Sequence, residues 1–289
     1  MMIEPPPKSR NQLEWSRFEP AESGDWFLNL PPYYALLFEN QHPFIMKKSD
    51  KGWYDSKSEI TKYVFLSGLE KIEVETIRNF IDDYKKLVVI GINKNIKDQF
   101  DNELDSCMAL DYHFIKRVDK RTEIGALEYL AKYEEDDNAI NMLVENLLKY
   151  INRMPNLKNA GNISFCYVAP DPDKKFHLPR ILTEKMVRNA KKDLNLDDYY
   201  PIIHSKLKVK KPQLKRIDIL KKISVWENLI FFNQINISTT VQDRDIILLD
   251  DLYQSGVSIW SMAKFLKMNG ARMVLGLTCT KTLRDTDNL

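Results

Sequence analysis

Cysteine is scarce in this sequence. Three of the 289 residues are cysteines, Cys107, Cys166 and Cys279, and they lie far apart. Their odd number and wide spacing exclude a Cys-x-x-Cys metal site and argue against a disulfide framework. We therefore expect three reduced, partly buried thiols.

Long apolar runs and a strong net charge are also missing. No run approaches the roughly 18 residues that a membrane-spanning helix needs, and the stretch from Met1 to Lys8 lacks the apolar core of a signal peptide. The formal net charge of +2 argues neither for nor against a nucleic-acid partner. We expect a cytoplasmic protein with a real core and no membrane contact.

The chain is long enough for one large or two modest domains. Residues 1–20 are rich in proline and polar side chains, which predicts a disordered tail. Residues 21–118 form an N-terminal α+β region in which we find no motif. The patterns there predict strands at Tyr63–Leu66 and Leu87–Ile92, and helices at Val74–Lys86 and Ile96–Met108.

Residues 119–289 show a regular alternation of strand and helix patterns. We expect helices at Glu123–Tyr133, Ala139–Ile151 and Arg180–Lys192, and strands at Ile163–Val168, Tyr199–His204 and Leu229–Phe232. Such alternation predicts an α/β fold with a doubly wound, mainly parallel sheet.

The clearest signal lies near the end of the chain. Ile246–Leu249 is an aliphatic run typical of a buried parallel strand, and Asp250 and Asp251 follow it directly. Ser255-Gly256 predicts a tight turn that opens a helix at Val257, and the N–H groups of such a helix start attract anions. A further strand is expected at Met273–Thr278. This βαβ unit could hold hydroxyl groups on its aspartates and a phosphate on its turn.

Residues 246–258 resemble the phosphoribosyl-diphosphate (PRPP) motif of type I phosphoribosyltransferases. The resemblance implies that Asp250 and Asp251 are the catalytic acidic pair and bind the ribose hydroxyls. It implies that the turn holds the 5′-phosphate, with the PRPP-binding residues Leu252, Tyr253, Gln254, Ser255, Gly256, Val257 and Ser258. Mg²⁺ would arrive with PRPP rather than on direct protein ligands. A generic nucleotide-binding or receiver domain remains the alternative.

Three upstream segments are similar to the ComF-like branch of that family, over about residues 121–285. They are Ile124–Tyr133, Val168-Ala169-Pro170, and Lys211-Pro212-Gln213 followed by Trp226-Glu227-Asn228-Leu229. Two features depart from that branch. The four-cysteine zinc element is absent, and Phe176–Arg180 stands where an Arg-Gly-Phe-Asn-Gln stretch is usual.

The pyrophosphate of PRPP needs cations or backbone N–H groups. Our candidates lie in the loop after the expected strand at 163–168, and a solvated loop is the alternative: Ala169, Pro170, Asp171, Lys174 and Lys175. A dense basic segment follows, as a flap over PRPP, a nucleic-acid patch or a solvated loop: Lys206, Lys208, Lys210, Lys211, Lys215 and Arg216.

Two classes of function fit these patterns. The first is an Mg²⁺-dependent phosphoribosyltransferase that transfers or cleaves a phosphoribosyl group on an unidentified acceptor. The second is a non-catalytic PRPP or nucleotide sensor, acting in DNA handling or as an effector subunit of an anti-phage defence assembly. In the second class residues 21–118 would dock a protein partner, and a homodimer is compatible with both. We expect His42, His113, His177 and His204 to be structural, and Trp260 to lie in the core.

Overall fold

The computed structural model describes residues 13, 16–57, 61–92, 96–100, 103–115, 118–193, 201–212 and 218–283. The chain forms two compact units that divide between Val88 and Val89. The sequence pattern placed this boundary near residue 118, about 30 residues later.

The first unit is a four-stranded antiparallel sheet, in the order β1-β2-β4-β3, with three helices. Its elements in chain order are β1 (Arg17–Pro20), β2 (Trp26–Leu30), α1 (Pro32–Gln41), α2 (Pro43–Met46), β3 (Tyr54–Asp55), β4 (Lys62–Leu66) and α3 (Lys71–Lys86). β1 thus forms from residues that the composition assigned to a tail. The strand and helix predicted at 63–66 and 74–86 are confirmed.

Aromatic side chains fill the core of the first unit. Phe38 of α1 packs edge-on against Phe80 of α3, with ring centroids 5.1 Å apart. Tyr34 and Tyr84 join them from the same two helices. Alternate residues of β2, among them Leu28, are fully buried beneath this cluster, as expected for a sheet covered by helices on one face.

The second unit carries the chemistry-bearing residues. Its elements in chain order are β5 (Val88–Ile90), β6 (Ser106–Tyr112), α4 (Glu123–Tyr129) with a π-helical turn (Leu130–Glu134), α5 (Asp137–Ile151), a 3₁₀ turn (Leu157–Asn159), β7 (Ile163–Tyr167), α6 (Leu178–Asp193), β8 (Ile202–Ile203), β9 (Ser205–Leu207), α7 (Ile219–Phe231), β10 (Ile235–Ile237), β11 (Asp245–Tyr253), α8 (Val257–Met268) and β12 (Met273–Lys281). β9 and β10 form a small antiparallel ribbon.

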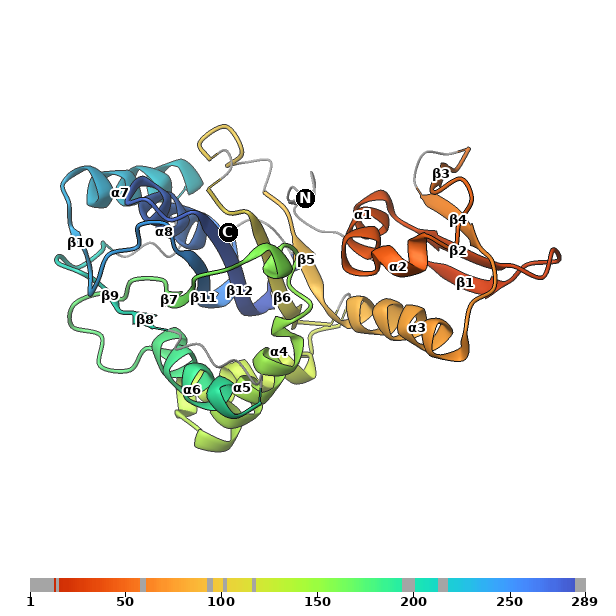
Figure 1. Cartoon of the computed structure of the whole chain (residues 1–289). Coiled ribbons are helices and arrows are strands. Elements are labelled where there is room, and N and C mark those ends of the chain that lie inside the picture. Colours follow the sequence, from red (N-terminus) through yellow and green to blue (C-terminus); the bar gives the residue numbers. More distant parts are fainter. Residues whose placement is uncertain are drawn as a thin grey trace. The chain divides into compact units, whose positions relative to one another are not determined.

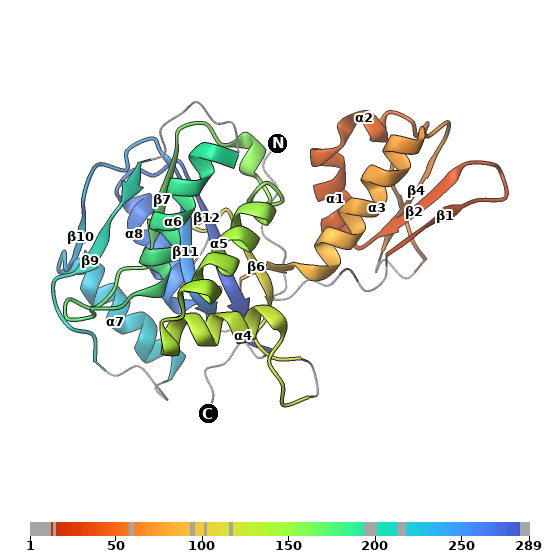
Figure 2. The ribbon, with the colours of Figure 1, turned by 90° about the horizontal axis from the view of Figure 1, so that it is seen from below.

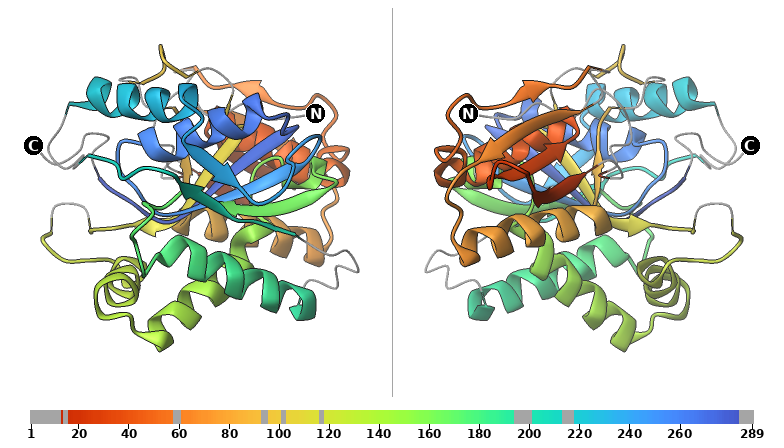
Figure 3. Two further views of the ribbon diagram at one scale, coloured as in Figure 1. Left: turned by 90° about the vertical axis from the view of Figure 1, so that its left-hand side faces the viewer. Right: turned by 90° about the vertical axis from the view of Figure 1, so that its right-hand side faces the viewer.

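A six-stranded sheet in the order β5-β6-β12-β11-β7-β8 forms the centre of this unit (Figure 1). β6, β12, β11, β7 and β8 pair in parallel. Figure 2 looks onto the layer of α4, α5 and α6, which covers one face, and Figure 3 shows α7 and α8 on the other. The predicted α/β class with a doubly wound, mainly parallel sheet is confirmed for this unit, as is the closing βαβ arrangement.

Two predicted elements are wrong. No helix spans Ile96–Met108, because residues from Ser106 onward pair in register with β12, and this long-range pairing overrides the local helical period. Leu229–Phe232 is no strand, since Leu229 lies in the last turns of α7. The run belongs to the end of a helix that begins at the Asp218 cap, where the carboxylate accepts the N–H of Leu220. Leu229 is buried there, whereas Phe231 and Phe232 are exposed.

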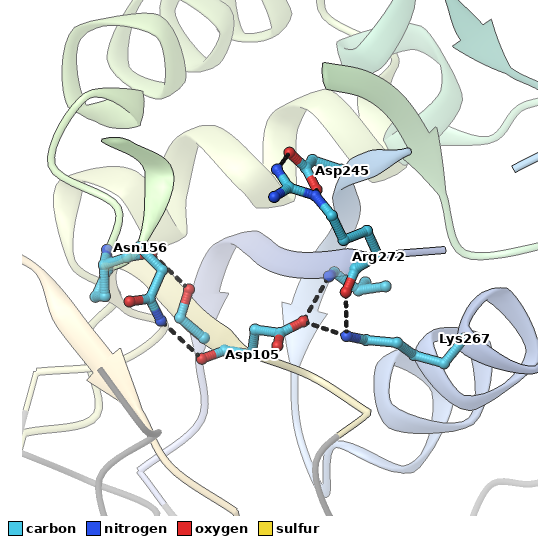
Figure 4. A network of polar contacts seen from close by, with 8 residues as sticks. Asp105, Asn156, Asp245, Lys267 and Arg272 are labelled. Carbon is cyan, nitrogen blue, oxygen red and sulfur yellow. Dashed lines mark hydrogen bonds and ion pairs between the residues drawn. The ribbon is translucent and has the colours of Figure 1, made fainter. Parts of the chain in front are cut away.

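A polar network fixes the edge of the sheet where β11 and β12 begin (Figure 4). The Asp105 carboxylate accepts the N–H of Val274 at 2.7 Å and lies 2.8 Å from the Lys267 ammonium. The buried Asp245 carboxylate pairs with the Arg272 guanidinium and also accepts the N–H of Gly161 at 2.6 Å. These contacts tie the strand starts together and leave the opposite edge, where the strands end, for a ligand.

The sequence led us to expect three reduced, partly buried thiols and no membrane-spanning helix. Cys107, Cys166 and Cys279 are free and buried, and burial raises the pKa of the Cys166 thiol to about 12. They therefore stay protonated at neutral pH. Within the described ranges, no helix has the length and apolar character to cross a bilayer.

Candidate functional site

A cavity of about 1040 Å³ opens at the edge of the sheet where β11 ends. β11 continues four residues beyond the predicted end of the strand, so Asp250 and Asp251 lie within it and not after it. Both aspartates line the cavity, as does every residue from Leu252 to Ser258. The structure thus gathers all nine predicted ribose- and phosphate-binding residues around one hollow.

The turn at Gly256 gives the cavity its concave wall. Gly256 has a φ of +85°, in the left-handed region that favours glycine, and it caps α8. A Cβ at this position would collide with the hydroxyl of Tyr253, which accepts a hydrogen bond from the Trp260 indole at 3.1 Å. Trp260 is buried in the core as predicted. The first-turn N–H groups of α8 have no partners within the helix, so they can hold an anion at this wall.

Lys132 brings a positive charge to the aspartates from a distant part of the chain. It lies in the π-helical turn at the end of α4, and its ammonium is 2.7 Å from the Asp251 carboxylate and 3.7 Å from that of Glu128. A π-helical turn shifts side chains relative to a regular helix and is frequent at functional sites. Here it coincides with the residue that reaches Asp251.

The two aspartates have opposite protonation tendencies. Burial, together with the neighbouring charge of Asp251, raises the pKa of Asp250 to about 7. Burial would also raise the pKa of Asp251, but the Lys132 ammonium outweighs this effect and holds it below the usual range. For Lys132, burial opposes the charged form, yet Asp251 and Glu128 raise its pKa above the ordinary value. The pair can therefore offer one hydroxyl donor and one carboxylate acceptor near neutral pH.

A second wall of the cavity comes from the loop after β7 and the basic segment. The backbone N–H of Lys211 donates to the Asp171 carboxylate at 3.0 Å, which joins these two segments. The Lys211 ammonium lies 4.7 Å from the ring centroid of Trp226 in α7. Burial lowers the pKa of Lys211, although Asp171 and Asp250 favour its charged form. This wall therefore presents the Lys211 ammonium, which is partly shielded from water, within reach of Asp250 and Asp251.

The structure separates the other predicted residues into two groups. Asp171, Lys210 and Lys211 line the cavity. Ala169 is buried and, with Pro170, Lys174 and Lys175, is not among the lining residues, although the charge of Lys174 contributes to the low pKa of Asp251. Lys206 and Lys208 are exposed beside the β9–β10 ribbon. Lys215 and Arg216 lie outside the described residues.

Several lining residues were not predicted as part of the site: His113, Phe114, Arg121, Lys132, Tyr133, Trp226, Thr282 and Leu283. Lys132, Tyr133 and Trp226 lie in the segments that resemble the ComF-like branch. His113 was expected to be structural and nevertheless faces the cavity.

His177 fits the structural role expected for it. It is 6% exposed at the start of α6 and packs against the ring of Tyr167. Burial and the nearby charge of Lys174 lower its pKa to about 3. It is therefore neutral at physiological pH.

The donor set fits a hard cation that arrives with a phosphate ligand. The oxygens of Asp171, Asp250 and Asp251 line the cavity, and Mg²⁺ prefers such oxygen ligands while keeping several waters. Over the described part of the chain, no cluster of three or more acidic, histidine or cysteine side chains could hold a metal alone.

Comparisons with known proteins add little to this geometry. No family model matches the chain, and no curated protein is significantly similar to it. Among solved structures, a hypoxanthine-guanine phosphoribosyltransferase from Bacillus anthracis is 10% identical, with a TM-score of 0.31 over 52% of this chain and 74% of that one. A hypoxanthine phosphoribosyltransferase from Staphylococcus aureus is 10% identical, with a TM-score of 0.32 over 52% and 68%. Similarities this low carry no inference about what the chain binds or does.

Proposed function

We propose that the cavity binds PRPP with Mg²⁺, and that the protein transfers the phosphoribosyl group to an acceptor or cleaves it. The observation that supports this proposal most directly is that the aspartate pair on β11 and the Gly256 turn at the start of α8 line the same cavity. One part suits the hydroxyls of a ribose, and the other suits its 5′-phosphate. The ComF-like resemblance of residues 121–285 supports the same reading.

Each wall then has a role. Asp251, ionised beside Lys132, accepts a hydrogen bond from a ribose hydroxyl, and Asp250 donates or accepts according to its protonation. Residues 254–258 hold the 5′-phosphate. Lys210 and Lys211 neutralise the pyrophosphate, with Lys174 close by. The loop from Ala169 to Lys175 supplies this side of the site mainly through Asp171, which positions Lys211.

Transfer breaks the bond between C1 of the ribose and the pyrophosphate while positive charge develops on the ring. Mg²⁺, when bound with its phosphate ligand beside Asp171, Asp250 and Asp251, would supply positive charge that stabilises the departing pyrophosphate. The carboxylate of Asp251 stabilises the cationic ring electrostatically, and Lys210 and Lys211 hold the leaving group. The protein thus acts mainly by positioning and charge stabilisation.

Calorimetry with PRPP and MgCl₂ tests the binding site. The double variant Asp250→Asn/Asp251→Asn should lose affinity by about 100-fold or more, since two hydrogen bonds to charged or polarised groups are removed. Glu145→Gln, an exposed carboxylate on α5, is the matched control and should bind like the wild type. Unchanged binding in the double variant, or no binding by the wild type, would refute the proposal.

A non-catalytic role is favoured by a different observation. Lys206 and Lys208 are exposed on the β9–β10 ribbon and do not line the cavity, so the enzyme hypothesis gives them no task. A PRPP or nucleotide sensor acting on DNA, alone or as an effector in a defence assembly, would use them as phosphate contacts. Salt-sensitive DNA binding that Lys206→Gln/Lys208→Gln abolishes, without any turnover of PRPP, would favour this role. Partner docking by residues 21–118 and homodimer formation remain predictions.

A further inference from the structure

A buried carboxylate holds a histidine at the side of the cavity next to β6. His113 follows the last residue of β6 and lines the cavity. Its Nδ1 atom lies 3.0 Å from Oε2 of Glu128, whose side chain is 2% exposed. Thr280 on β12 approaches the same Nδ1 at 3.4 Å. With Nδ1 facing the carboxylate, the other ring nitrogen is left to act as a proton acceptor.

The position of this histidine is fixed by the start of α4. The Thr122 hydroxyl donates to the carbonyl of Tyr112 at 2.5 Å and accepts the N–H of Gly125 at 3.0 Å. Gly125 packs so closely on the carbonyl of His113 that a Cβ there would collide with it. α4 therefore locks against the end of β6, and Glu128, one turn further along, faces the histidine ring.

Glu128 also links His113 to the ribose side of the cavity. Its second oxygen lies 3.7 Å from the Lys132 ammonium, which contacts Asp251. Its Oε2 atom makes no well-aligned hydrogen bond within the described structure, although the histidine is in ion-pair range. Burying a carboxylate with incomplete partners costs free energy. A carboxylate that is kept buried at such a cost is typical of a functional site, where it interacts with other groups once the ligand is bound.

The strand order places His113 opposite the pyrophosphate side. In the order β6-β12-β11-β7, the aspartates lie on β11, the loop with Asp171 follows β7, and His113 follows β6. If the leaving pyrophosphate points toward β7, an acceptor that attacks C1 in line must approach from the side of β12 and β6. His113 lies on that side.

We propose that His113 is a general base for the acceptor and that Glu128 orients it. This inference rests on the proposed function. The acceptor nitrogen or oxygen forms the new bond to C1 and transfers its proton to the free ring nitrogen of His113. The C1–O bond breaks, and its electron pair leaves with pyrophosphate. His113 is thus the catalytic residue, and Glu128 is a positioning residue that keeps the ring in one tautomer.

Charged and polar groups approach His113 from several elements. Glu128 faces it from α4, with Lys132 behind that carboxylate. Thr280 faces it from β12, and Arg121 stacks on Phe114, the next residue. Glu128 is the nearest charge to the ring.

The test compares His113→Gln and Glu128→Gln with the wild type, using PRPP with MgCl₂ as the ligand and water or a panel of free bases as acceptors. His113→Gln should keep PRPP affinity within about two-fold and lose pyrophosphate release by about 100-fold to 10,000-fold. The rise of the rate with pH, which reports the free base, should vanish. His204→Gln, a histidine that does not line the cavity, should leave both unchanged.

Glu128→Gln gives a readout that a merely structural role would not move. Its kcat should fall, although less than in His113→Gln, while its KM for PRPP should stay within about two-fold of the wild type. Retained release or an unchanged limb in His113→Gln would overturn the proposal, as would a joint loss of PRPP binding. A wild type that binds PRPP but releases no pyrophosphate with any acceptor would overturn it and leave the binding site standing. A wild type that does not bind PRPP would refute the proposed function itself.

Discussion

The two walls of the cavity are built in different ways. The wall at β11 and α8 comes from one continuous stretch, residues 250–258, and its shape depends on backbone conformation at Gly256. The facing wall combines Lys132 from a π-helical turn, Lys211 from a loop and Trp226 from α7. The first wall offers turn N–H groups and hydroxyls, and the second offers cations with low exposure.

This difference predicts different sensitivities. Changes in the Gly256 turn of the β11–α8 wall should act through sterics and backbone strain, independently of pH and salt. Changes to the two lysines of the facing wall should act through charge, because Lys132 is held by ion pairs and the Lys211 ammonium lies over the Trp226 ring. The two walls would not differ in this way if a change in the Gly256 turn depended on pH and salt, or if a change at Lys132 did not.

The largest effect should come from Lys132→Met. It leaves the Asp251 and Glu128 carboxylates, 13% and 2% exposed, without their shared cation. Removing one partner of a buried ion pair costs about 3–5 kcal/mol, and the partial exposure of Lys132 reduces this to about 2–3 kcal/mol. Urea denaturation measures the loss in the free energy of unfolding.

Lys185→Met is the matched control for that change. Lys185 has nearly the same exposure as Lys132, 27% against 25%, but its partner Asp137 is 86% exposed. Its loss should cost less than about 1 kcal/mol. Equal losses in both variants would mean that burial of the carboxylates is not what makes Lys132 important.

Gly256→Ala should come next, at about 2 kcal/mol. The left-handed backbone costs a residue with a Cβ about 1–2 kcal/mol, and the new methyl group also meets the Tyr253 hydroxyl. Gly52→Ala, with a φ of +67° and open space around it, carries the strain without the collision. Gly256→Ala should therefore destabilise more and should also weaken PRPP binding. An equal cost for both would remove the steric part of the argument.

The same contrast decides what the sequence could predict. The β11–α8 wall was predictable residue by residue, because strand, acidic pair, turn and helix follow one another and each has a local signature. The extension of β11 to Tyr253 was not, since it depends on pairing of Leu252 with Thr280 in the neighbouring strand. The doubly wound sheet followed from alternation of elements along the chain.

The facing wall could be predicted only in part. Lys211 was proposed from the density of basic residues, but that density gives no reason to separate it from the exposed Lys206. His113 and Glu128 are fifteen residues apart and meet because the start of α4 folds back on the end of β6. Such contacts depend on tertiary packing, which a single sequence does not encode at fixed spacing.

An effect that varies with pH tests the aspartate pair directly. The folded pKa of Asp250 is about 7, above the ordinary value of 3.8, so its contribution to stability is full below about pH 4 and is lost as pH rises toward 7. The slope cannot exceed about 1.4 kcal/mol per pH unit for one group. Asp251 behaves oppositely, and its contribution is lost only as pH falls below its usual range. In Asp250→Asn, denaturation curves between pH 4 and about 7 should lose this slope, and an unchanged slope would assign it to another group.

The smallest effect should come from Tyr253→Phe, which removes both a hydrogen bond and a steric contact on the β11–α8 wall. It removes the acceptor of the buried Trp260 indole N–H at a cost of about 1–2 kcal/mol. It also removes the atom that a Cβ at residue 256 would meet first, while the rest of the ring stays in place. In a double-mutant cycle, Gly256→Ala should therefore cost about 0.5–1 kcal/mol less in the Tyr253→Phe background. Strict additivity would show that strain at Gly256 alone, without the collision with Tyr253, requires glycine in this turn.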